Sequence, residues 1–355
     1  FPFHFWLPHA MSAPTPVSAY LHSATMVKAG IFLLGRFFPV LAGTDLWFYS
    51  VSSMGLATLL LGAYFALFQH DIKGLLAYST ISHLGLITLL FGLGTPLGEI
   101  AAIFHILNHA VFKASLFMAA GIIDHETGSR DMRRINGLFR FMPYTALLAM
   151  VAAAAMAGVP LLNGFLSKEM FFGETLGLRW LSEAEWHWLF PWAATLAGVF
   201  AVAYSLRFIH DVFFNGEPRD LARTPHEPPR WMKFPVEVLV ILCVAVGTLP
   251  NFTVRPLLEV AATAVLQQPL PEFSLSIWHG FTTPFIMSLV ALSGGVVLYA
   301  GRQWLFAAQD RSPLRLSGKT IVERLINRLF DLGHWIDATL DNRSLRRYSF
   351  FLLVS

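Results

Sequence analysis

Three titratable side chains lie inside one apolar stretch of this 355-residue chain. His105, His109 and Lys113 occur at four-residue intervals within FHILNHAVFKASLF, at residues 104–117. In an α-helix this spacing places all three on one face, over about 12 Å of rise. Such groups can pass protons to one another through intervening waters, because histidine titrates near neutral pH and burial favours the neutral form of lysine. The motif therefore predicts a proton relay.

Other apolar stretches carry titratable groups of the same kind. His22 and Lys28 lie in PVSAYLHSATMVKAGIFLL, and a separation of six residues, about 9 Å of helical rise, places them on different faces. His83 lies in YSTISHLG beside hydroxyl side chains that can hold water, and Lys168 follows a glycine- and proline-rich break. The candidate relay residues are therefore His22, Lys28, His83, His105, His109, Lys113 and Lys168.

The composition indicates which elements position these side chains. The chain is 55% hydrophobic and 13% charged, with a mean hydropathy of +0.57, whereas soluble domains carry about 25% charged residues. Repeated apolar stretches of about 17 to 25 residues are typical of membrane-spanning helices. The predicted fold class is therefore all-α, a polytopic membrane protein. The single cysteine, Cys243, excludes an internal disulfide framework and an iron–sulfur cluster.

Eight apolar spans organise the chain, and an amphipathic segment at 319–340 is expected to lie along the membrane surface. The spans are 16–41, 47–69, 74–94, 100–123, 143–175, 188–213, 235–250 and 279–300. Both ends of the chain lie within or beside apolar runs, so we expect an internal fragment of a longer protein. The expected parts are the end of a broken helix and its loop at 1–13, a transmembrane core at 14–215, additional helices at 216–310, and a surface helix with the start of a truncated region at 311–355.

The distribution of basic residues predicts the orientation of these spans. With eight crossings, the connections form two alternating sets, and the basic set is cytoplasmic by the positive-inside rule. The basic set holds Lys73, Arg130, Arg133, Arg134, Arg140, Arg219, Arg223, Arg230, Lys233 and the tail from Arg302. The other set holds little beyond Arg36, Arg179 and Arg255.

Two segments are expected to interrupt helices. WLPHAMSAPTPVS places three prolines close together near the start, and MAGVPLLNGFLSKE places Pro160, Asn163 and Gly164 in the middle of the fifth span. Proline removes a backbone donor and clashes with the preceding turn. The carbonyls that it frees are tolerated at membrane depth only inside protein or beside a wet cavity. Broken helices of this kind recur at ion sites of transporters.

Simpler interpretations compete with the relay. A charged group costs about 2.5–3.5 kcal/mol at the centre of a membrane helix, so these groups should face protein or water. A single histidine such as His83 can serve only as a hydrogen-bonding residue between helices. Lysines near helix ends can extend to the headgroups, which we expect of Lys73 and consider for Lys168. Glu99 is expected to open the fourth span, where the helix dipole favours an acid.

Haem ligation is the alternative from another chemical class. It needs axial ligands that face each other from neighbouring helices, whereas His105 and His109 share one helix face with a lysine. The sequence also has no P-loop, dinucleotide-binding fingerprint or zinc-type cluster. We therefore expect no cofactor, no metal site and no nucleic-acid partner.

Four motifs resemble a known family: LPHAMSAPTPVSAYLHSATMVKAG, QHDIKGLLAYSTISHLG, FHILNHAVFKASLFMAAGIIDHETGSRD and AGVPLLNGFLSKEMFF. They resemble the A subunit of Mrp-type multisubunit cation/proton antiporters and, more distantly, the antiporter-like L subunit of NADH:quinone oxidoreductase. The resemblance is dense over residues 1 to 175 and looser afterwards, at WHGF and NRSLRRY.

The resemblance implies an antiporter-like core of two pseudosymmetric five-helix bundles, with half-channels joined by a polar axis. By position, His22 and Lys28 match axis residues, and His105, His109 and Lys113 match the bridge between half-channels. Lys168 matches the lysine of the second broken helix, at the exit half-channel. The carboxylate and lysine of the first broken helix would lie upstream of Phe1.

We therefore expect a proton-conducting subunit that couples inward proton flow to export of a monovalent cation, Na⁺, in a bacterial inner membrane. Its partners would be the other subunits of a hetero-oligomeric antiporter complex and the lipid bilayer; it would not itself be an enzyme. One alternative is a proton-pumping membrane subunit of NADH:quinone oxidoreductase, which co-purifying subunits would distinguish. The other is a structural scaffold, which neutral substitutions that leave transport intact would support.

Overall fold

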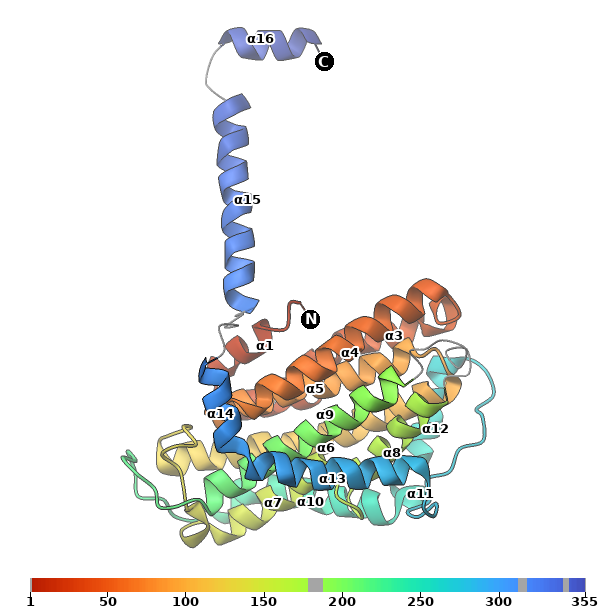
Figure 1. Ribbon diagram of the computed structural model, residues 1–355, viewed down its shortest axis with the longest axis vertical. Helices are drawn as coiled ribbons and strands as arrows, with labels where there is room; N and C mark the ends of the chain where they lie inside the picture. Colours follow the sequence, from red (N-terminus) through yellow and green to blue (C-terminus); the bar gives the residue numbers. More distant parts are fainter. Residues whose placement is uncertain (1, 178–187, 312–317, 341–344, 355) are drawn as a thin grey trace.

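The computed structural model describes residues 2–177, 188–311, 318–340 and 345–354, and these residues form a helical bundle with two helices projecting from it (Figure 1). Arg179 of the predicted outer loops lies outside the described residues. The principal helices of the bundle are α2 (Thr15–Ser23), α3 (Ala29–Leu41), α4 (Asp45–Leu67), α5 (Ile72–Gly92), α6 (Pro96–Thr127), α7 (Pro143–Ala157), α8 (Asn163–Leu176), α9 (Leu189–Leu206), α10 (Arg230–Thr248), α12 (Arg255–Leu266) and α13 (Thr283–Ala300). Short helices α1 (Trp6–His9), η1 (Ala10–Ser12), η3 (Leu138–Arg140) and α11 (Pro250–Thr253) lie in the connections.

Seven of the eight predicted spans are confirmed among the described residues as helical segments long and apolar enough to cross a membrane. They are Thr15–Leu41, Asp45–Leu67, Ile72–Gly92, Pro96–Thr127, Leu189–Asp211, Arg230–Thr248 and Thr283–Ala300. The remaining predicted span, 143–175, is present as the two shorter helices α7 and α8, which are separated by an irregular segment. The chain is thus a multi-pass membrane protein with a discontinuous helix.

The first span differs from the prediction because it is not a continuous helix. α2 ends at Ser23, and a short 3-10 turn, η2 (Met26–Lys28), precedes α3. The Ser23 hydroxyl donates to the Ala19 carbonyl at 2.5 Å, and the Thr25 hydroxyl donates to the Tyr20 carbonyl at 3.2 Å. Serine and threonine side chains that bond back to the preceding turn bend helices and compete with the backbone ladder. The interpretation of 16–41 as one helix was therefore wrong in its continuity.

Side-chain caps fix where several helices begin. The Thr44 hydroxyl accepts from the Trp47 amide at 3.2 Å, the Asp71 carboxylate from the Lys73 amide at 2.9 Å, and the Thr95 hydroxyl from the Gly98 amide at 3.0 Å. Each cap satisfies an amide that the helix itself leaves unpaired. α6 ends at Thr127, and Gly128 caps it with a φ of 68°, the left-handed conformation that glycine adopts without steric cost.

α4 and α5 form the closest pair of helices in the bundle. A Cβ atom added at Gly55 or Gly62 of α4, or at Gly85 or Gly92 of α5, would collide with the backbone of the opposite helix. Small residues at a membrane helix interface let backbones approach in this way. The approach lets the Ser82 hydroxyl donate to the Leu59 carbonyl across the pair, at 3.0 Å, and it fixes the face of α5 that carries His83.

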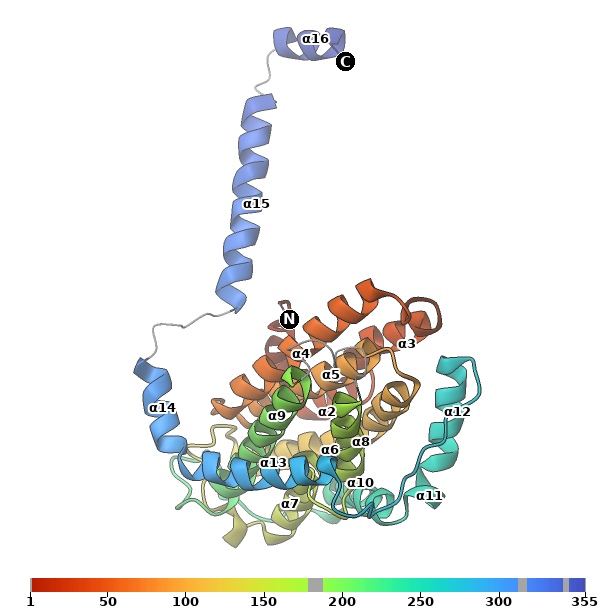
Figure 2. The same ribbon diagram turned by 45° about the vertical axis from the view of Figure 1, so that its right-hand side comes forward.

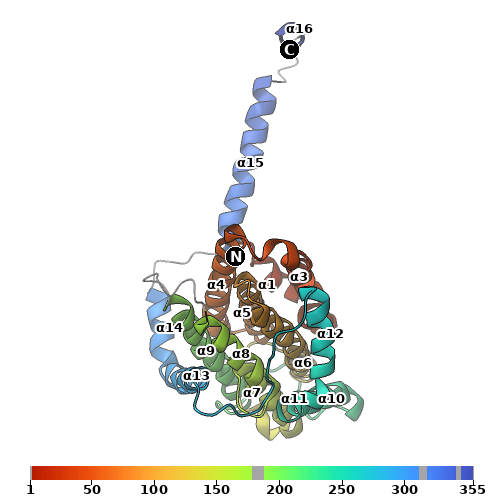
Figure 3. The same cartoon turned by 90° about the vertical axis from the view of Figure 1, so that its right-hand side faces the viewer.

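The other helices surround α5 and α6. α6 packs against α2, α5, α7, α8 and α10, and α9 packs against α4, α7, α8 and α13. Figure 2 shows α13 beside α9, and Figure 3 shows α12 near α3 at another edge of the bundle. Because α5, α6 and α8 lie innermost, the side chains between them are removed from lipid.

The last two helices of the chain, α15 (Gly318–Leu340) and α16 (Leu345–Val354), project from the bundle in all three views. α14 (Arg302–Arg311) follows α13 and precedes them. α15 coincides with the predicted amphipathic helix at 319–340, and its side chains Leu329, Phe330 and Trp335 are exposed. Its place on a membrane surface stays a prediction, as does the division of the chain into four parts.

Basic connections meet at one end of the bundle, as the loop alternation predicts. The Arg219 amide donates to the Arg134 carbonyl at 2.9 Å, which joins two of the basic loops. Arg130 forms an ion pair with Asp71 of a third connection at 3.7 Å. The assignment of this end to the cytoplasm stays a prediction.

Candidate functional site

A chain of hydrogen-bonded side chains crosses the middle of the bundle. His83 Nδ1 of α5 lies 2.9 Å from His105 Nε2 of α6, and His105 Nδ1 lies 2.9 Å from the Ser167 hydroxyl of α8. His83 Nε2 lies 3.3 Å from the Tyr204 hydroxyl of α9. All four side chains are buried. Four helices thus contribute one group each to a continuous path, which we call the His83–His105 chain (Tyr204, His83, His105 and Ser167).

His109 lies beside this chain without a direct bond to it. Its ring centroid is 5.4 Å from that of His83 and 6.5 Å from that of His105. Neither ring nitrogen of His109 forms a hydrogen bond with a side chain of the described residues, although the side chain is fully buried. Buried polar groups normally have a partner in protein or ordered water, so His109 is suited to exchange a proton through water.

Three buried lysines surround the histidines, and each donates to a helix carbonyl. Lys28 Nζ donates to the Ile106 carbonyl at 2.8 Å, which attaches η2 to α6 between His105 and His109. Lys113 Nζ donates to the Ser79 hydroxyl and, at 3.3 Å, to the Leu76 carbonyl of α5. These contacts confirm that both lysines face protein and not lipid.

Lys168 is held by the break between α7 and α8. Its ammonium donates to the Met156 carbonyl at 2.7 Å and the Ala157 carbonyl at 2.9 Å, the last carbonyls of α7. Extension of Lys168 to the headgroups is therefore contradicted, because the side chain is 6% exposed and bonded inside. None of Lys28, Lys113 and Lys168 forms an ion pair with a carboxylate in the described part of the chain.

The break itself has the residues that the sequence indicated. Gly158 adopts φ 88°, and a Cβ atom there would lie 2.8 Å from Cδ of Lys168. At Gly164 a Cβ atom would collide with the Ala155 carbonyl. Asn163 donates to the Asn108 carbonyl at 3.4 Å, and Asn108 donates to the Asn163 carbonyl at 3.0 Å.

Pro160 and Leu161 complete the turn between the two half-helices. Both are exposed, and Leu161 adopts φ 68°, a strained conformation for a residue with a side chain. The structure therefore places Pro160 at the surface of the break, and Asn163 and Gly164 on its buried side.

His22 forms no direct hydrogen bond with the other predicted relay residues in the described part of the chain. It is 1% exposed and its ring lies 6.1 Å from that of Phe117, but neither ring nitrogen has a hydrogen-bond partner in the described residues. The structure therefore brings His83 and His105 into direct contact and His109 beside them, while His22 reaches them through no direct bond.

Several side chains of the candidate site were missed or misjudged from the sequence. Lys73 was expected to extend to the headgroups, but it is 1% exposed and donates to the Ala13 carbonyl at 2.7 Å, beside the first proline-rich break. A freed carbonyl is a nearer acceptor than the headgroups, so that prediction was wrong. Ser167 and Tyr204 were not considered, although both are polar residues inside apolar helices, the signal that identified the histidines.

Glu99 occupies the first turn of α6, as expected. Its carboxylate is more deeply buried than an interaction with the helix dipole requires. The side chain is 0% exposed, and neither carboxylate oxygen has a hydrogen-bond partner among the described residues.

A multi-pass bundle whose broken helix holds a buried lysine on its freed carbonyls has the architecture of an ion transporter. The chain belongs to the NADH:quinone oxidoreductase/Mrp antiporter transmembrane family, whose model matches residues 1–198. The predicted resemblance is thereby confirmed.

Two curated relatives and two solved structures illustrate the likeness. The A/B subunit of a probable K⁺/H⁺ antiporter of Rhizobium meliloti is 61% identical over 98% of this chain and 35% of the relative. The A subunit of the Na⁺/H⁺ antiporter of Bacillus subtilis is 40% identical over 93% of this chain and 43% of the relative. A chain of the Mrp complex from Dietzia sp. matches with a TM-score of 0.86 and 36% identity, over 98% of this chain and 37% of its own.

Respiratory complex I from Thermus thermophilus is a more distant match, with a TM-score of 0.61 and 26% identity over 75% of this chain and 55% of its own. The chain spans less than half the length of the curated relatives described above.

Proposed function

We propose that this chain carries part of the proton path of a multisubunit monovalent cation/proton antiporter in a bacterial inner membrane. The observation that supports this function is the His83–His105 chain, with Lys28, Lys113 and Lys168 around it and no carboxylate partner for these lysines in the described residues. Its partners would be the other subunits of the antiporter complex. Residues 14–215 would form the antiporter-like core, and 311–355 would begin at the membrane surface.

The two contacting imidazoles would move a proton by exchanging tautomers. A neutral imidazole accepts at one ring nitrogen and donates at the other. A proton delivered to His83 from the side of Tyr204 can therefore pass to His105 and leave toward Ser167, with no movement of the rings. Ser167 adjoins Lys168 in sequence, so the far end of the chain lies at the broken helix. His109 would exchange protons with this chain through water.

The lysines would couple neighbouring steps by electrostatic repulsion. Two like charges about 10 Å apart interact by about 1.7 kcal/mol at an effective dielectric constant of 20. A difference of 1.4 kcal/mol is a tenfold change in an equilibrium constant. Protonation of one lysine would therefore lower the proton affinity of the next. A proton that enters the series Lys28, Lys113 and Lys168 at one end would cause the release of a proton at the other end. His22 would belong to this path only through intervening water.

We propose the chemical class of the transported cation from the names of the relatives. The relatives are named for K⁺/H⁺ and for Na⁺/H⁺ antiport, so we propose a monovalent alkali cation, with Na⁺ as the expected one. The test is antiport in everted vesicles that contain the whole complex, with Na⁺ and K⁺ supplied separately at several pH values. Cation-dependent proton movement that is lost when this subunit is deleted would support the proposal. Its full persistence without the subunit would refute it.

A proton-pumping subunit of NADH:quinone oxidoreductase is the weaker alternative, favoured only by the family description and the more distant structural match. Co-purification with redox subunits would support it, and co-purification with antiporter subunits would exclude it.

A further inference from the structure

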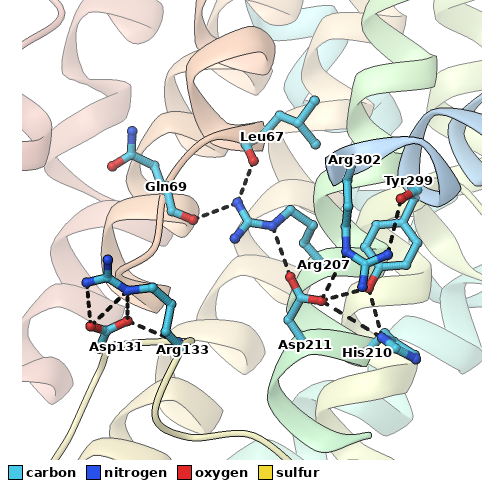
Figure 4. A network of polar contacts seen from close by, with 9 residues as sticks. All are labelled: Leu67, Gln69, Asp131, Arg133, Arg207, His210, Asp211, Tyr299 and Arg302. Carbon is cyan, nitrogen blue, oxygen red and sulfur yellow. Dashed lines mark hydrogen bonds and ion pairs between the residues drawn. The ribbon is translucent and has the colours of Figure 1, made fainter. Parts of the chain in front are cut away.

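A second polar cluster, centred on the buried Arg207, lies at the basic end of α9, apart from the residues of the proposed proton path. There the helix continues as a π-helical turn, η5 (Arg207–Asp211). The Arg207 side chain is 2% exposed and pairs with the Asp211 carboxylate at 3.1 Å. It also donates through Nη1 to the carbonyls of Leu67 at 2.5 Å and Gln69 at 2.7 Å, where α4 ends (Figure 4).

One carboxylate serves several donors in this cluster. The Tyr299 hydroxyl of α13 donates to Asp211 at 2.7 Å, and Arg302 of α14 lies 3.7 Å from the same oxygen. Figure 4 shows Arg207 and Arg302 approaching Asp211 from different helices. Asp211 thus faces two guanidinium groups with a single negative charge.

A third guanidinium completes the cluster from the loop after α6. Arg133 pairs with Asp131, at 2.7 Å for the closest contact. Arg133, Arg207, Asp211 and Arg302 line a cavity of about 260 Å³. Its other lining residues are His70, Met132, Asn136, Asn215, Gln303 and Phe306. Three guanidiniums against Asp131 and Asp211 leave one uncompensated positive charge at the cavity.

Each guanidinium also has one terminal nitrogen that meets no acceptor in the part of the chain that the structure describes. Arg207 uses Nε and Nη1, Arg302 uses Nε and Nη1, and Arg133 uses Nε and Nη2. The Nη2 atoms of Arg207 and Arg302 and the Nη1 atom of Arg133 have no partner in the described residues. Arginine forks match the oxygens of phosphate, so these three nitrogens are free to donate to an anion in the cavity.

The electrostatics of the neighbouring histidine agree with an excess of positive charge. Burial and the nearby Arg207 and Arg133 lower the pKa of His70, although Asp131 and Asp211 act to raise it. An anion would therefore be favoured there.

We propose that this cavity binds one singly charged phosphate group, supplied by the headgroup of an anionic phospholipid such as phosphatidylglycerol. The charge of the phosphate matches the excess of the cluster, and its oxygens would accept from the three unpaired guanidinium nitrogens. Anionic lipids gather at the cytoplasmic surface, where the positive-inside rule places this end. Phe68 and Phe306, with ring centroids 5.6 Å apart, provide an apolar wall for the lipid beyond its headgroup.

The experiment uses the purified complex with its full-length subunit in neutral detergent. Thermal unfolding is followed while phosphatidylglycerol, phosphatidylcholine or inorganic phosphate is added. Phosphatidylglycerol should raise the melting temperature, and Arg302→Gln should need about tenfold more of it, since a charge-assisted hydrogen bond contributes at least as much as a tenfold change requires. Arg302→Lys should recover part of the loss.

Arg140→Gln is the matched control, because Arg140 lies in the same basic loop as Arg133 but is exposed and forms an ion pair with Glu217 at 3.5 Å, outside the cavity. It should titrate like the unmodified protein. If Arg302→Gln prevents assembly, the exposed Arg133→Gln tests the same loss. An equal phosphatidylglycerol midpoint in the unmodified protein and in the cluster variants would overturn the proposal. An arginine-dependent shift with inorganic phosphate alone would establish the phosphate site and overturn the lipid as its source.

Discussion

Replacing His105 tests whether the His83–His105 chain carries protons or only joins helices. Glutamine at this position can donate and accept hydrogen bonds toward His83 and Ser167, but it offers no site that binds a proton near neutral pH. Leucine would remove both bonds. His105→Gln should therefore separate proton transfer from structural support, since only the first depends on a titratable ring.

The expected magnitudes follow from the two contacts of His105, each 2.9 Å long. Interhelical hydrogen bonds in membranes contribute about 0.6 kcal/mol on average and about 1.7 at most, so His105→Leu should lower stability by about 1–3 kcal/mol. His105→Gln should lower it by less than about 1 kcal/mol on the same scale. Loss of the titratable ring should raise the barrier to proton transfer by at least about 1.4 kcal/mol, which slows the transfer tenfold. Both variants should therefore retain at most about one tenth of the antiport rate.

The assay measures cation-dependent proton movement in everted vesicles, together with the melting temperature of the purified complex. His334→Gln is the control, since it makes the same chemical change at an exposed position of α15. A His105→Gln variant that assembles and transports at the full rate would show that His105 is a structural residue, and the proposed path would have to run elsewhere.

Three further predictions address the lysines, the helix break and the basic loop. Lys113→Ala should abolish antiport while the complex still assembles, which transport and co-purification of the subunits would measure together; full activity would remove Lys113 from the path. Gly158→Ala should reduce both stability and transport, because the added Cβ would lie 2.8 Å from the Lys168 side chain. Gly216→Ala is the control: its φ of 87° is similar but the space around it is open, so it should show only the backbone cost of about 1–2 kcal/mol. Equal losses in both variants would exclude an effect through Lys168. The pKa of Asp131 is lowered to about 2 by its hydrogen bonds to an arginine, so its contribution to stability is present above pH 4 and is lost as the pH falls toward about 2; Asp131→Asn should remove this part of the acid dependence of the melting temperature, and an unchanged profile would contradict it.

The sequence predicted the helices well because each carries its own signal. Apolar length identified the spans, and glycine and proline identified the break at 158–164, since both effects depend on local backbone chemistry. Four-residue spacing correctly placed His105, His109 and Lys113 on one buried face of α6.

Contacts between helices could not be predicted in the same way. The bond between His83 and His105 depends on how closely α5 and α6 pack and on the rotation of each, which neither segment specifies alone. The same is true of Ser167 and Tyr204, whose hydroxyls can be assigned to the His83–His105 chain only once their contacts with the imidazoles are known. Continuity through Ser23 was mispredicted because serine in an apolar helix is compatible both with a straight helix and with back-bonding to the preceding turn.

The contacts of the lysines link the helix breaks to the proposed proton path. A broken helix leaves carbonyls without donors, and in each of two places a lysine supplies them: Lys168 at Met156 and Ala157, and Lys73 at Ala13. An amine keeps N–H donors after it loses its proton, so the freed carbonyls remain hydrogen-bonded in both charge states. An ionised carboxylate has no proton to donate and could not play this part. In the proposed mechanism, lysine would therefore allow the charge at the break to change during transport while the backbone around it stays in place.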